Sequence, residues 1–293
     1  MTILLFGRHG QLGRQLAPRL ARLGRVRVLG RAEADLASPG QPADLIRDLR
    51  PQLVVNAAAY TAVDRAEAEE TLARRVNAEA PAAMAAAARD CGALFVHYST
   101  DYVFDGRGTR PYREDDPTAP LNAYGRTKRA GEAAVAAAGG QWLVFRTAWV
   151  YARQGRNFLN TMLRLAGERD RLQVVDDQVG SPTSAAAIAD ATVAVLAAVT
   201  ARGGLAPGQA GVYHMTCAGE TTWCGFARRI FAEVEVDVEV IPVPTEAYPT
   251  PAARPRYSVL DCRRLGETFG VTLPPWEAAL AACLAEPDAG ALR

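Results

Sequence analysis

Residues 2–13 read T-I-L-L-F-G-R-H-G-Q-L-G, and this stretch decides the fold. Ile3 to Phe6 is a short, continuous apolar run, typical of a strand buried on both faces of a parallel sheet. The run passes directly into a G-x-x-G-x-x-G pattern, and a helix-period stretch from Gln11 to Leu23 follows. A strand, a glycine-rich turn and a helix in this order are the context in which such glycines bind a dinucleotide.

Each glycine of the turn has its own expected task. Gly7 permits the tight turn, Gly10 lets the backbone approach a pyrophosphate, and Gly13 lets the helix pack closely on the strand. The free N–H groups at the helix start would then face the phosphates. Three glycines at this spacing can also form a purely structural turn, but their position between the first strand and the first helix favours a cofactor site.

The first half of the chain alternates between apolar runs and helix-period stretches. Further strands are expected at Val26–Leu29, Leu53–Asn56, Ala93–Tyr98 and Trp142–Phe145, and further helices at Ala66–Arg89 and Asn122–Ala138. Such alternation predicts right-handed βαβ units in a doubly wound, Rossmann-type α/β fold.

The pattern loosens after about residue 150. A helix is expected at Asn157–Gly167, a strand at Leu172–Val175, a helix from Ser184 and a strand at Val212–Met215. The proline-rich residues 242–255 cannot continue a helix or a central strand. We therefore expect a cofactor-binding domain of residues 1–150 plus about 184–216. A smaller, discontinuous α/β substrate lobe would take residues 151–183 plus about 217–293.

Composition excludes several classes of protein. The 33 basic and 32 acidic residues give a net charge of +1, so no global field would attract nucleic acid or an anionic membrane. The five cysteines are scattered without a C-x-x-C pair, so we expect no metal site and no disulfide framework. No apolar run reaches the roughly 18 residues that span a bilayer. We expect a cytoplasmic protein.

The end of the second strand bears on the choice of cofactor. An acidic residue that binds the adenosine ribose is usual there, but this chain has Gly30 and Arg31. Arg31, with Arg8, would suit the 2′-phosphate of NADP, although both arginines could instead be solvated surface residues. The sequence therefore favours NADPH and leaves NADH open.

Tyr124 and Lys128 form a Y-x-x-x-K pattern on a predicted helix. Positions i and i+4 share a helix face, so both side chains can point at one site. The tyrosine has a pKa of about 10 in water, and a neighbouring ammonium favours the phenolate. Lys128 can also bind the nicotinamide ribose. The pattern alone is common by chance.

Thr100 makes the pattern specific. It lies in S-T-D-Y-V-F-D (residues 99–105), directly after an apolar strand, where open α/β sheets bind ligands. Tyr124 follows Thr100 by 24 residues, a spacing that suits a loop and the first turn of the next helix. The Thr100 hydroxyl could donate to a substrate carbonyl beside the tyrosine. We therefore predict Tyr124, Lys128 and Thr100 as the catalytic group.

These motifs resemble a known family. G-x-x-G-Q-L-G, N-A-A-A-Y-T-A-V-D, S-T-D-Y-V-F-D-G, Y-G-R-T-K and R-T-A-W-V-Y are similar to those of extended short-chain dehydrogenases/reductases. More narrowly, the chain resembles the dTDP-4-dehydrorhamnose reductase family. That resemblance continues through D-D-Q-V-G-S-P-T and A-Y-P-T-P-A-A-R-P-R-Y-S, so it covers nearly the whole chain.

The resemblance implies roles for individual residues. The pyrophosphate would lie at Gly10, Gln11 and Leu12, the adenine near Asp35 and Leu36, and the nicotinamide half along Ala59, Tyr60, Thr61 and Tyr98. The neighbouring Ala57 and Ala58 are small enough to let a cofactor lie flat over the sheet edge, or they serve only tight packing. Thr100 and Asp101 would meet the sugar, and Trp149 would stack against it unless it is a core aromatic. Arg254 and Arg256 would meet the substrate diphosphate or remain solvated.

The implied reaction is hydride transfer from NAD(P)H to the C4 ketone of a dTDP-4-keto-6-deoxy-L-hexose. Two alternatives stay open. One is a non-catalytic NADP-binding regulatory subunit like that of methionine adenosyltransferase, and the other is a different sugar-nucleotide reductase or an epimerase.

One position pair departs from the family pattern. Some members are thought to dimerise through magnesium held by glutamates, but the matching positions here are Gln15 and Ala186. We therefore expect a monomer or a weak homodimer without a magnesium bridge.

Overall fold

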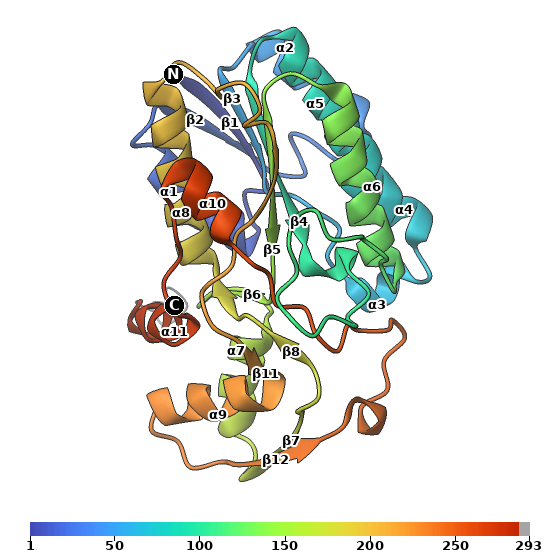
Figure 1. Ribbon diagram of the computed structural model, residues 1–293, viewed down its shortest axis with the longest axis vertical. Coiled ribbons are helices and arrows are strands. Elements are labelled where there is room, and N and C mark those ends of the chain that lie inside the picture. The colour runs from blue at the N-terminus through green and yellow to red at the C-terminus, as the bar shows by residue number, and fades with distance from the viewer. Residues whose placement is uncertain (287–293) are drawn as a thin grey trace.

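A six-stranded, all-parallel sheet forms the centre of the computed structural model, which describes residues 1–286 (Figure 1). Its strands are β1 (Thr2–Phe6), β2 (Arg25–Leu29), β3 (Leu53–Asn56), β4 (Leu94–Thr100), β5 (Trp142–Thr147) and β10 (Gly211–His214). The order across the sheet is β10-β5-β4-β3-β1-β2. Every apolar run expected to be a strand of this sheet is one, which confirms the predicted Rossmann-type fold.

The sheet has a topological switch point between β1 and β3. The chain leaves β1 for β2 on one side and then crosses back to β3 on the other. Connections that diverge in this way leave a crevice at the carboxyl ends of the two strands, where doubly wound folds bind ligands. Gly7 and Ala57 are the first residues beyond these ends.

Helices cover both faces of the sheet, and alternate strand residues supply the contacts. Ile3 and Leu5 belong to the core on the face of α1 (Gln11–Leu20) and α8 (Ala185–Ala201). Leu4 and Phe6 belong to the core on the opposite face. Figure 1 shows α2 (Gly40–Leu49), α5 (Ala80–Asp90) and α6 (Ala123–Ala138) on that second face.

The sequence did not predict α2. Its first turn contains Gly40 and Pro42, two residues that weaken a helical pattern, although proline is tolerated in a first turn. Only a narrow stripe that includes Ala43 and Ile46 is buried.

The single helix expected over Ala66–Arg89 is wrong. The structure divides this stretch into α3 (Val63–Ala66), α4 (Glu70–Arg74), a π-helical turn η1 (Arg75–Glu79) and α5. Asn77 in the π-helical turn accepts from the Tyr60 backbone N–H at 2.8 Å and donates to the Tyr60 carbonyl at 3.0 Å. The wider turn thus carries a side chain that holds the loop after β3 in place.

Smaller elements gather beyond the carboxyl ends of the strands (Figure 1). They comprise β6 (Val150–Tyr151), α7 (Phe158–Ala166), β7 (Arg171–Val175), β8 (Val179–Gly180), β9 (Thr183–Ser184), β11 (Thr221–Thr222), α9 (Trp223–Glu233), β12 (Glu239–Val243) and α11 (Trp276–Ala285). A 3-10 turn η2 (Asp101–Val103) follows β4, another, η3 (Thr245–Ala247), follows β12, and α10 (Arg263–Phe269) packs near β10. The core on the α1/α8 face continues into these elements through Tyr151 and Phe226. Residues 287–293 of the expected substrate lobe lie outside the described part.

Over residues 1–286, no helix combines the length and apolarity needed to cross a bilayer. The five cysteines are all free.

Candidate active site

The turn after β1 can accommodate a dinucleotide pyrophosphate. Gly7 has φ +105°, and an added Cβ there would lie 2.8 Å from the carbonyl carbon of Ala57. An added Cβ at Gly13 would lie 2.0 Å from the Gly7 carbonyl oxygen, so only glycine lets α1 pack this closely. An added Cβ at Gly10 would lie 3.4 Å from the Gly7 carbonyl oxygen and 3.9 Å from that of Ala57, so this side of the turn is more open than at the other two glycines. These contacts fit the expected division of tasks among the three glycines.

Gln11 and Leu12 continue the turn into α1. The Gln11 Oε1 atom accepts from the Asn157 amide at 2.7 Å, so the helix start is tied to the segment before α7. Leu12 packs partly buried against the core. The two residues therefore contribute mainly their backbone to the open side of the turn.

A carboxylate does lie at the end of β2, contrary to the sequence-based expectation. Glu33 reaches back to accept from the Gly30 N–H at 3.0 Å and pairs with Arg8 at 2.6 Å. Arg31 is largely exposed and its Nε lies 3.3 Å from Asp35 Oδ2. Glu33 follows Gly13 by 20 residues, the usual distance to the acidic residue of dinucleotide-binding units, and this spacing was the missed signal.

Two residues expected at the cofactor have their side chains elsewhere. Leu36 is buried in the core on the α2/α5 face. The Tyr98 ring lies on the α8 face, where its hydroxyl is 2.8 Å from Thr192 Oγ1. Only their backbone atoms are available to a ligand at the sheet edge, because both side chains are fixed in the core.

The loop after β3 lies beside the glycine turn. The Ala57 N–H donates to the Phe6 carbonyl at 3.0 Å, and Ala58 to Thr61 continue along the edge, half-buried or exposed. The Tyr60 hydroxyl donates to Glu69 at 2.6 Å. The structure thus brings Ala57, Ala58, Ala59, Tyr60 and Thr61 to the β1/β3 switch point.

Thr100 ends β4 and caps the following turn. Its hydroxyl donates to Asp101 Oδ1 at 2.9 Å and accepts from the Tyr102 N–H at 3.2 Å. Asp101 is 2% exposed, and this burial raises its pKa to about 6. The hydroxyl is therefore already oriented by its neighbours, and its proton points at a carboxylate.

Tyr124 lies in the first turn of α6, close to Thr100. Asn122 caps this helix by accepting from the Gly125 N–H at 2.8 Å. The Tyr124 ring packs edge-on against Tyr102, with ring centroids 5.9 Å apart. Burial raises the pKa of Tyr124 to about 12, and the Thr100 hydroxyl partly opposes this rise. The tyrosine is therefore protonated at neutral pH.

Lys128 lies one turn further along α6 and is 1% exposed. Its ammonium donates to the Tyr98 carbonyl at 2.5 Å and lies 3.1 Å from His97 Nε2. Burial lowers the pKa of Lys128 to about 8, and burial also lowers the pKa of His97, which is consequently neutral. The expectation that Lys128 promotes the phenolate of Tyr124 is not met in this arrangement. Sequence reasoning missed His97, although it directly precedes Tyr98.

A buried ionic network supports the end of β4. Glu132 of α6 and Arg146 of β5 form two hydrogen bonds of 2.8 Å, and the Ser99 hydroxyl donates to Glu132 at 2.6 Å. Both charged side chains are at most 3% exposed. Because Ser99 precedes Thr100, this network fixes the strand end relative to the helix that carries Tyr124.

Trp149 stacks on another indole. Its ring lies parallel to that of Trp223, with centroids 3.4 Å apart and an interplanar angle of 3°. Trp149 has φ +46°, and an added Cβ at Gly180 would lie 2.4 Å from its ring. One face of the indole expected to stack on a sugar is therefore covered by Trp223.

The two arginines expected at a diphosphate have different partners. Arg254 forms two hydrogen bonds with Asp64 of α3, at 2.7 and 2.8 Å, and is half-buried. Arg256 is exposed and bonds Glu246 at 2.5 Å. Each guanidinium is thus paired with a carboxylate of a different element, and Asp64 is a partner that sequence reasoning missed.

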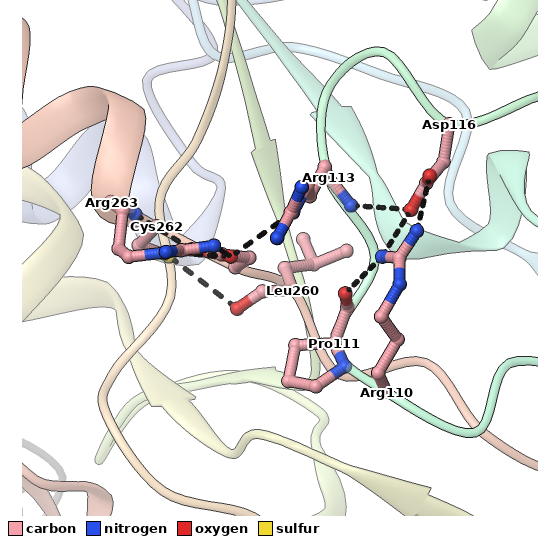
Figure 2. Close-up of polar contacts among 8 residues, drawn as sticks. Arg110, Pro111, Arg113, Asp116, Leu260, Cys262 and Arg263 are labelled. Carbon is pink, nitrogen blue, oxygen red and sulfur yellow. Dashed lines mark hydrogen bonds and ion pairs between the residues drawn. The ribbon is translucent and has the colours of Figure 1, made fainter.

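The loop after Thr100 is fastened to the segment before α10, as Figure 2 shows. Arg110 and Asp116 form paired hydrogen bonds of 2.8 Å, and the Arg113 N–H donates to Asp116 at 2.8 Å. Arg113 lies 3.8 Å from Asp261, which Arg263 also contacts at 2.6 Å. These contacts hold the loop against the segment that precedes α10.

Comparison with known proteins agrees with this architecture. The sequence matches the family described as RmlD substrate binding domain over residues 1–288. It is 51% identical to a dTDP-4-dehydrorhamnose reductase of Burkholderia thailandensis, covering 97% of this chain and 98% of that protein. A Salmonella typhimurium protein of the same name is 45% identical, over 98% of each chain.

Solved structures agree as well. A dTDP-4-dehydrorhamnose reductase of Bacillus anthracis, in complex with NADP, has a TM-score of 0.91 at 34% identity, covering 98% of this chain and 99% of that one. One of Clostridium acetobutylicum has a TM-score of 0.90 at 38% identity, covering 97% and 98%. With its glycine turn, its Thr100–Tyr124 arrangement and these full-length similarities, the chain belongs to the dTDP-4-dehydrorhamnose reductase family.

Proposed function

We propose that this chain reduces the C4 ketone of dTDP-4-dehydro-L-rhamnose to dTDP-L-rhamnose, with NADPH or NADH as the reductant. The observation that carries the proposal is the close approach of Thr100 and Tyr124 at the carboxyl end of β4. That position lies on the same edge of the sheet as the glycine turn. A hydride donor and a proton donor can therefore meet one carbonyl there.

Gly7, Gly10, Gln11, Leu12 and Gly13 would hold the pyrophosphate of the cofactor. When bound, the reduced nicotinamide supplies the hydride. The edge from Ala57 to Thr61 and the Tyr98 carbonyl would line its nicotinamide half. Lys128 would bind the ribose, which requires it to exchange its hydrogen bond to Tyr98 or His97 for ribose hydroxyls.

Tyr124 would protonate the substrate oxygen as the ketone becomes an alcohol. Its raised pKa keeps the phenolic proton in place until negative charge develops on that oxygen. The Thr100 hydroxyl would turn from Asp101 to the carbonyl oxygen and stabilise the same charge. Support of this kind typically contributes several kcal/mol to lowering a barrier.

The remaining sugar contacts are also proposals. Asp101 and Trp149 would contact the hexose, and Arg254 and Arg256 the diphosphate. Arg254 would have to leave Asp64 for this, whereas Arg256 is exposed and needs only a side-chain rotation. The dTDP-sugar is the only partner we propose.

We also propose the division into a cofactor domain, residues 1–150 plus about 184–216, and a substrate lobe, residues 151–183 plus about 217–293. The addition of β10 to the central sheet supports it. Five unpaired thiols support a reducing, cytoplasmic location.

The test is consumption of NADH and NADPH by the purified protein with dTDP-4-dehydro-L-rhamnose, followed at 340 nm. Tyr124→Phe should lose at least about 100-fold in kcat and retain cofactor affinity, because it removes only the proton donor. Tyr213→Phe, which removes a hydroxyl at the edge strand β10, is the matched control and should keep its activity. Unchanged turnover by Tyr124→Phe would exclude it as the proton donor.

An absence of turnover by the wild-type protein, with cofactor binding intact, would instead favour the regulatory-subunit alternative. Copurification of tightly held NAD would favour an epimerase, since a reductase must exchange its cofactor at every turnover.

A further inference from the structure

A chain of three buried polar side chains joins the end of β3 to α6. Asn56 and His97 lie opposite each other in the register of β3 and β4, and Asn56 Nδ2 is 3.2 Å from His97 Nδ1. The other ring nitrogen, His97 Nε2, is 3.1 Å from Lys128 Nζ. All three side chains are at most 1% exposed, so each polar atom depends on the partners around it.

The Asn56 amide gives this chain a direction. Its Oδ1 atom accepts from the Ala58 N–H at 3.1 Å. Because a backbone N–H only donates, the amide oxygen is fixed at Ala58 and the NH2 group faces the histidine. An NH2 group also only donates. His97 Nδ1 must therefore be the acceptor of this hydrogen bond.

The neutral imidazole then has one position left for its hydrogen. Burial and the charge of Lys128 lower the pKa of His97 more than the Asn56 backbone raises it, so the ring carries a single hydrogen. With Nδ1 accepting, that hydrogen lies on Nε2 and is donated to Lys128 Nζ. An ammonium has three donors and no acceptor, so only the neutral amine of Lys128 can accept it. The amine still donates to the Tyr98 carbonyl at 2.5 Å.

The ammonium form of Lys128 requires the opposite arrangement. It donates to His97 Nε2, which moves the ring hydrogen to Nδ1, where it meets the Asn56 NH2 group. Two donors then face each other in a buried site, and one of them is left without an acceptor. A buried donor without an acceptor is destabilising, so this arrangement opposes the ammonium.

We propose that Asn56 and His97 are positioning residues that favour the neutral amine of Lys128 over its ammonium in the cofactor-free protein. Asn56 fixes the tautomer of His97, and His97 presents a donor to Lys128. The inference deepens the proposed function and rests on it, because Lys128 is the residue that we propose to bind the nicotinamide ribose.

Burial acts on Lys128 in the same direction, and one nearby carboxylate opposes it. Glu132 raises the pKa of Lys128, but less than burial lowers it, and Glu132 is bonded to Arg146 of β5. The charged side chains of η1, α4 and α5 are exposed. The other titratable groups on elements that pack against α6 are Tyr98 of β4, Asp101 and Tyr102 of η2, and Asp64 and Arg65 of α3, beside Tyr124 of α6 itself.

The state of Lys128 affects how strongly it binds a ribose. A hydrogen bond from an ammonium to a hydroxyl is charge-assisted and about twice as strong as one from a neutral amine. Cofactor affinity should therefore fall as Lys128 loses its proton. Asn56 and His97 thus set the pH at which this loss of affinity occurs.

The first experiment observes the His97 tautomer directly, by two-bond proton–nitrogen correlation NMR of the whole cofactor-free protein at about pH 9, roughly one unit above the pKa of Lys128. The chain has three histidines, and His97→Gln identifies the signals of this one. The wild type should carry the hydrogen on Nε2. Asn56→Asp replaces the NH2 donor by an acceptor and should move the hydrogen to Nδ1.

The second experiment measures the Kd of NADH by isothermal titration calorimetry across the same pH range. The Kd of the wild type should rise about fivefold as Lys128 loses its proton, the difference between a charge-assisted and a neutral hydrogen bond. Asn56→Asp should move the midpoint of this rise up by about one pH unit, because it favours the ammonium. Asn56→Ala, which removes the amide without adding charge, should move the midpoint in the same direction by less.

Gln173→Glu is the matched control, since it adds one carboxylate at an exposed position of β7. It should change neither the tautomer nor the midpoint. A wild-type ring hydrogen on Nδ1 overturns the inference, and so does a midpoint that is the same in the wild type and both Asn56 variants. If the wild type binds no NADH at any pH, the proposed function fails, and the tautomer alone decides whether Asn56 orients His97.

Discussion

At the scale of single residues, burial decides the protonation states in the site. A nearby ammonium would lower the pKa of Tyr124 and favour its phenolate, but the Lys128 ammonium instead contacts the Tyr98 carbonyl and His97. Burial then raises the pKa of the tyrosine and lowers that of the lysine. The tyrosine keeps a proton to give, and the lysine is close to releasing its own.

The lowered pKa of Lys128 predicts a pH-dependent stability. The pKa is about 8 in the folded chain and 10.5 as the reference value, so the folded state releases the proton first and gains stability as pH rises through about 8. Relative to Lys128→Met, the wild type should gain about 1 kcal/mol of unfolding free energy between about pH 7 and about pH 9. Urea denaturation at a series of pH values measures this. If the difference in unfolding free energy between the wild type and Lys128→Met does not change with pH, the pKa of Lys128 is not shifted in the folded chain.

At the scale of elements, α6 is positioned by contacts along its whole length. Asn122 caps its start and also donates to the Ala253 carbonyl at 2.8 Å. An added Cβ at Gly131 would lie 2.1 Å from the Asn77 carbonyl oxygen, so glycine lets α6 approach the π-helical turn. Glu132 then ties the helix to β5 through Arg146. These contacts fix the helix that carries Tyr124 relative to the strand that carries Thr100.

Loss of the Glu132 carboxylate should be strongly destabilising. Glu132→Gln leaves Arg146 as a buried cation without its counterion, a change that typically costs 3–5 kcal/mol, so we expect a loss of about that size in unfolding free energy. Chemical denaturation measures it. Glu168→Gln, at the exposed pair with Arg164, should lose less than about 1 kcal/mol. Equal losses in the two variants would contradict the role of the buried network.

At the scale of the whole molecule, the core on the α1/α8 face extends from the sheet into the smaller elements. Near the end of the described chain, the Gln15 amide donates to Glu286 at 3.3 Å, and Arg19 pairs with Asp190 at 2.7 Å. Ala186 lines a groove with these two carboxylates. The carboxylates on this face therefore already have partners within the chain.

We accordingly expect magnesium to have no effect on assembly. The two positions that would supply glutamates are Gln15 and Ala186, so neither offers a carboxylate to a divalent cation, and the neighbouring Asp190 and Glu286 are already bonded to Arg19 and Gln15. Sedimentation velocity in millimolar magnesium and in EDTA should give the same coefficient. A magnesium-dependent dimer would contradict this, and Gln15→Glu would then test whether the missing carboxylate matters.

The sequence by itself determined the strands of the central sheet and most of the helices that cover it, because buried parallel strands require continuous apolar runs and the glycine turn joins the first strand directly to the first helix. It also determined the pairing of Thr100 with Tyr124, since the end of a strand and the start of the next helix meet at one sheet edge. Local patterns were sufficient for both.

Only the tertiary structure decided which partners the long side chains contact. Glu33 folds back onto Gly30 and Arg8, the Tyr98 ring enters the core beside α8, and Arg254 turns to Asp64. The π-helical turn around Asn77 likewise depends on a loop from another strand. Some of these contacts join residues that are distant along the chain. In others, a side chain has several possible partners nearby and bonds only some of them. Their outcome depends on burial and charge in the folded molecule, which periodicity does not encode.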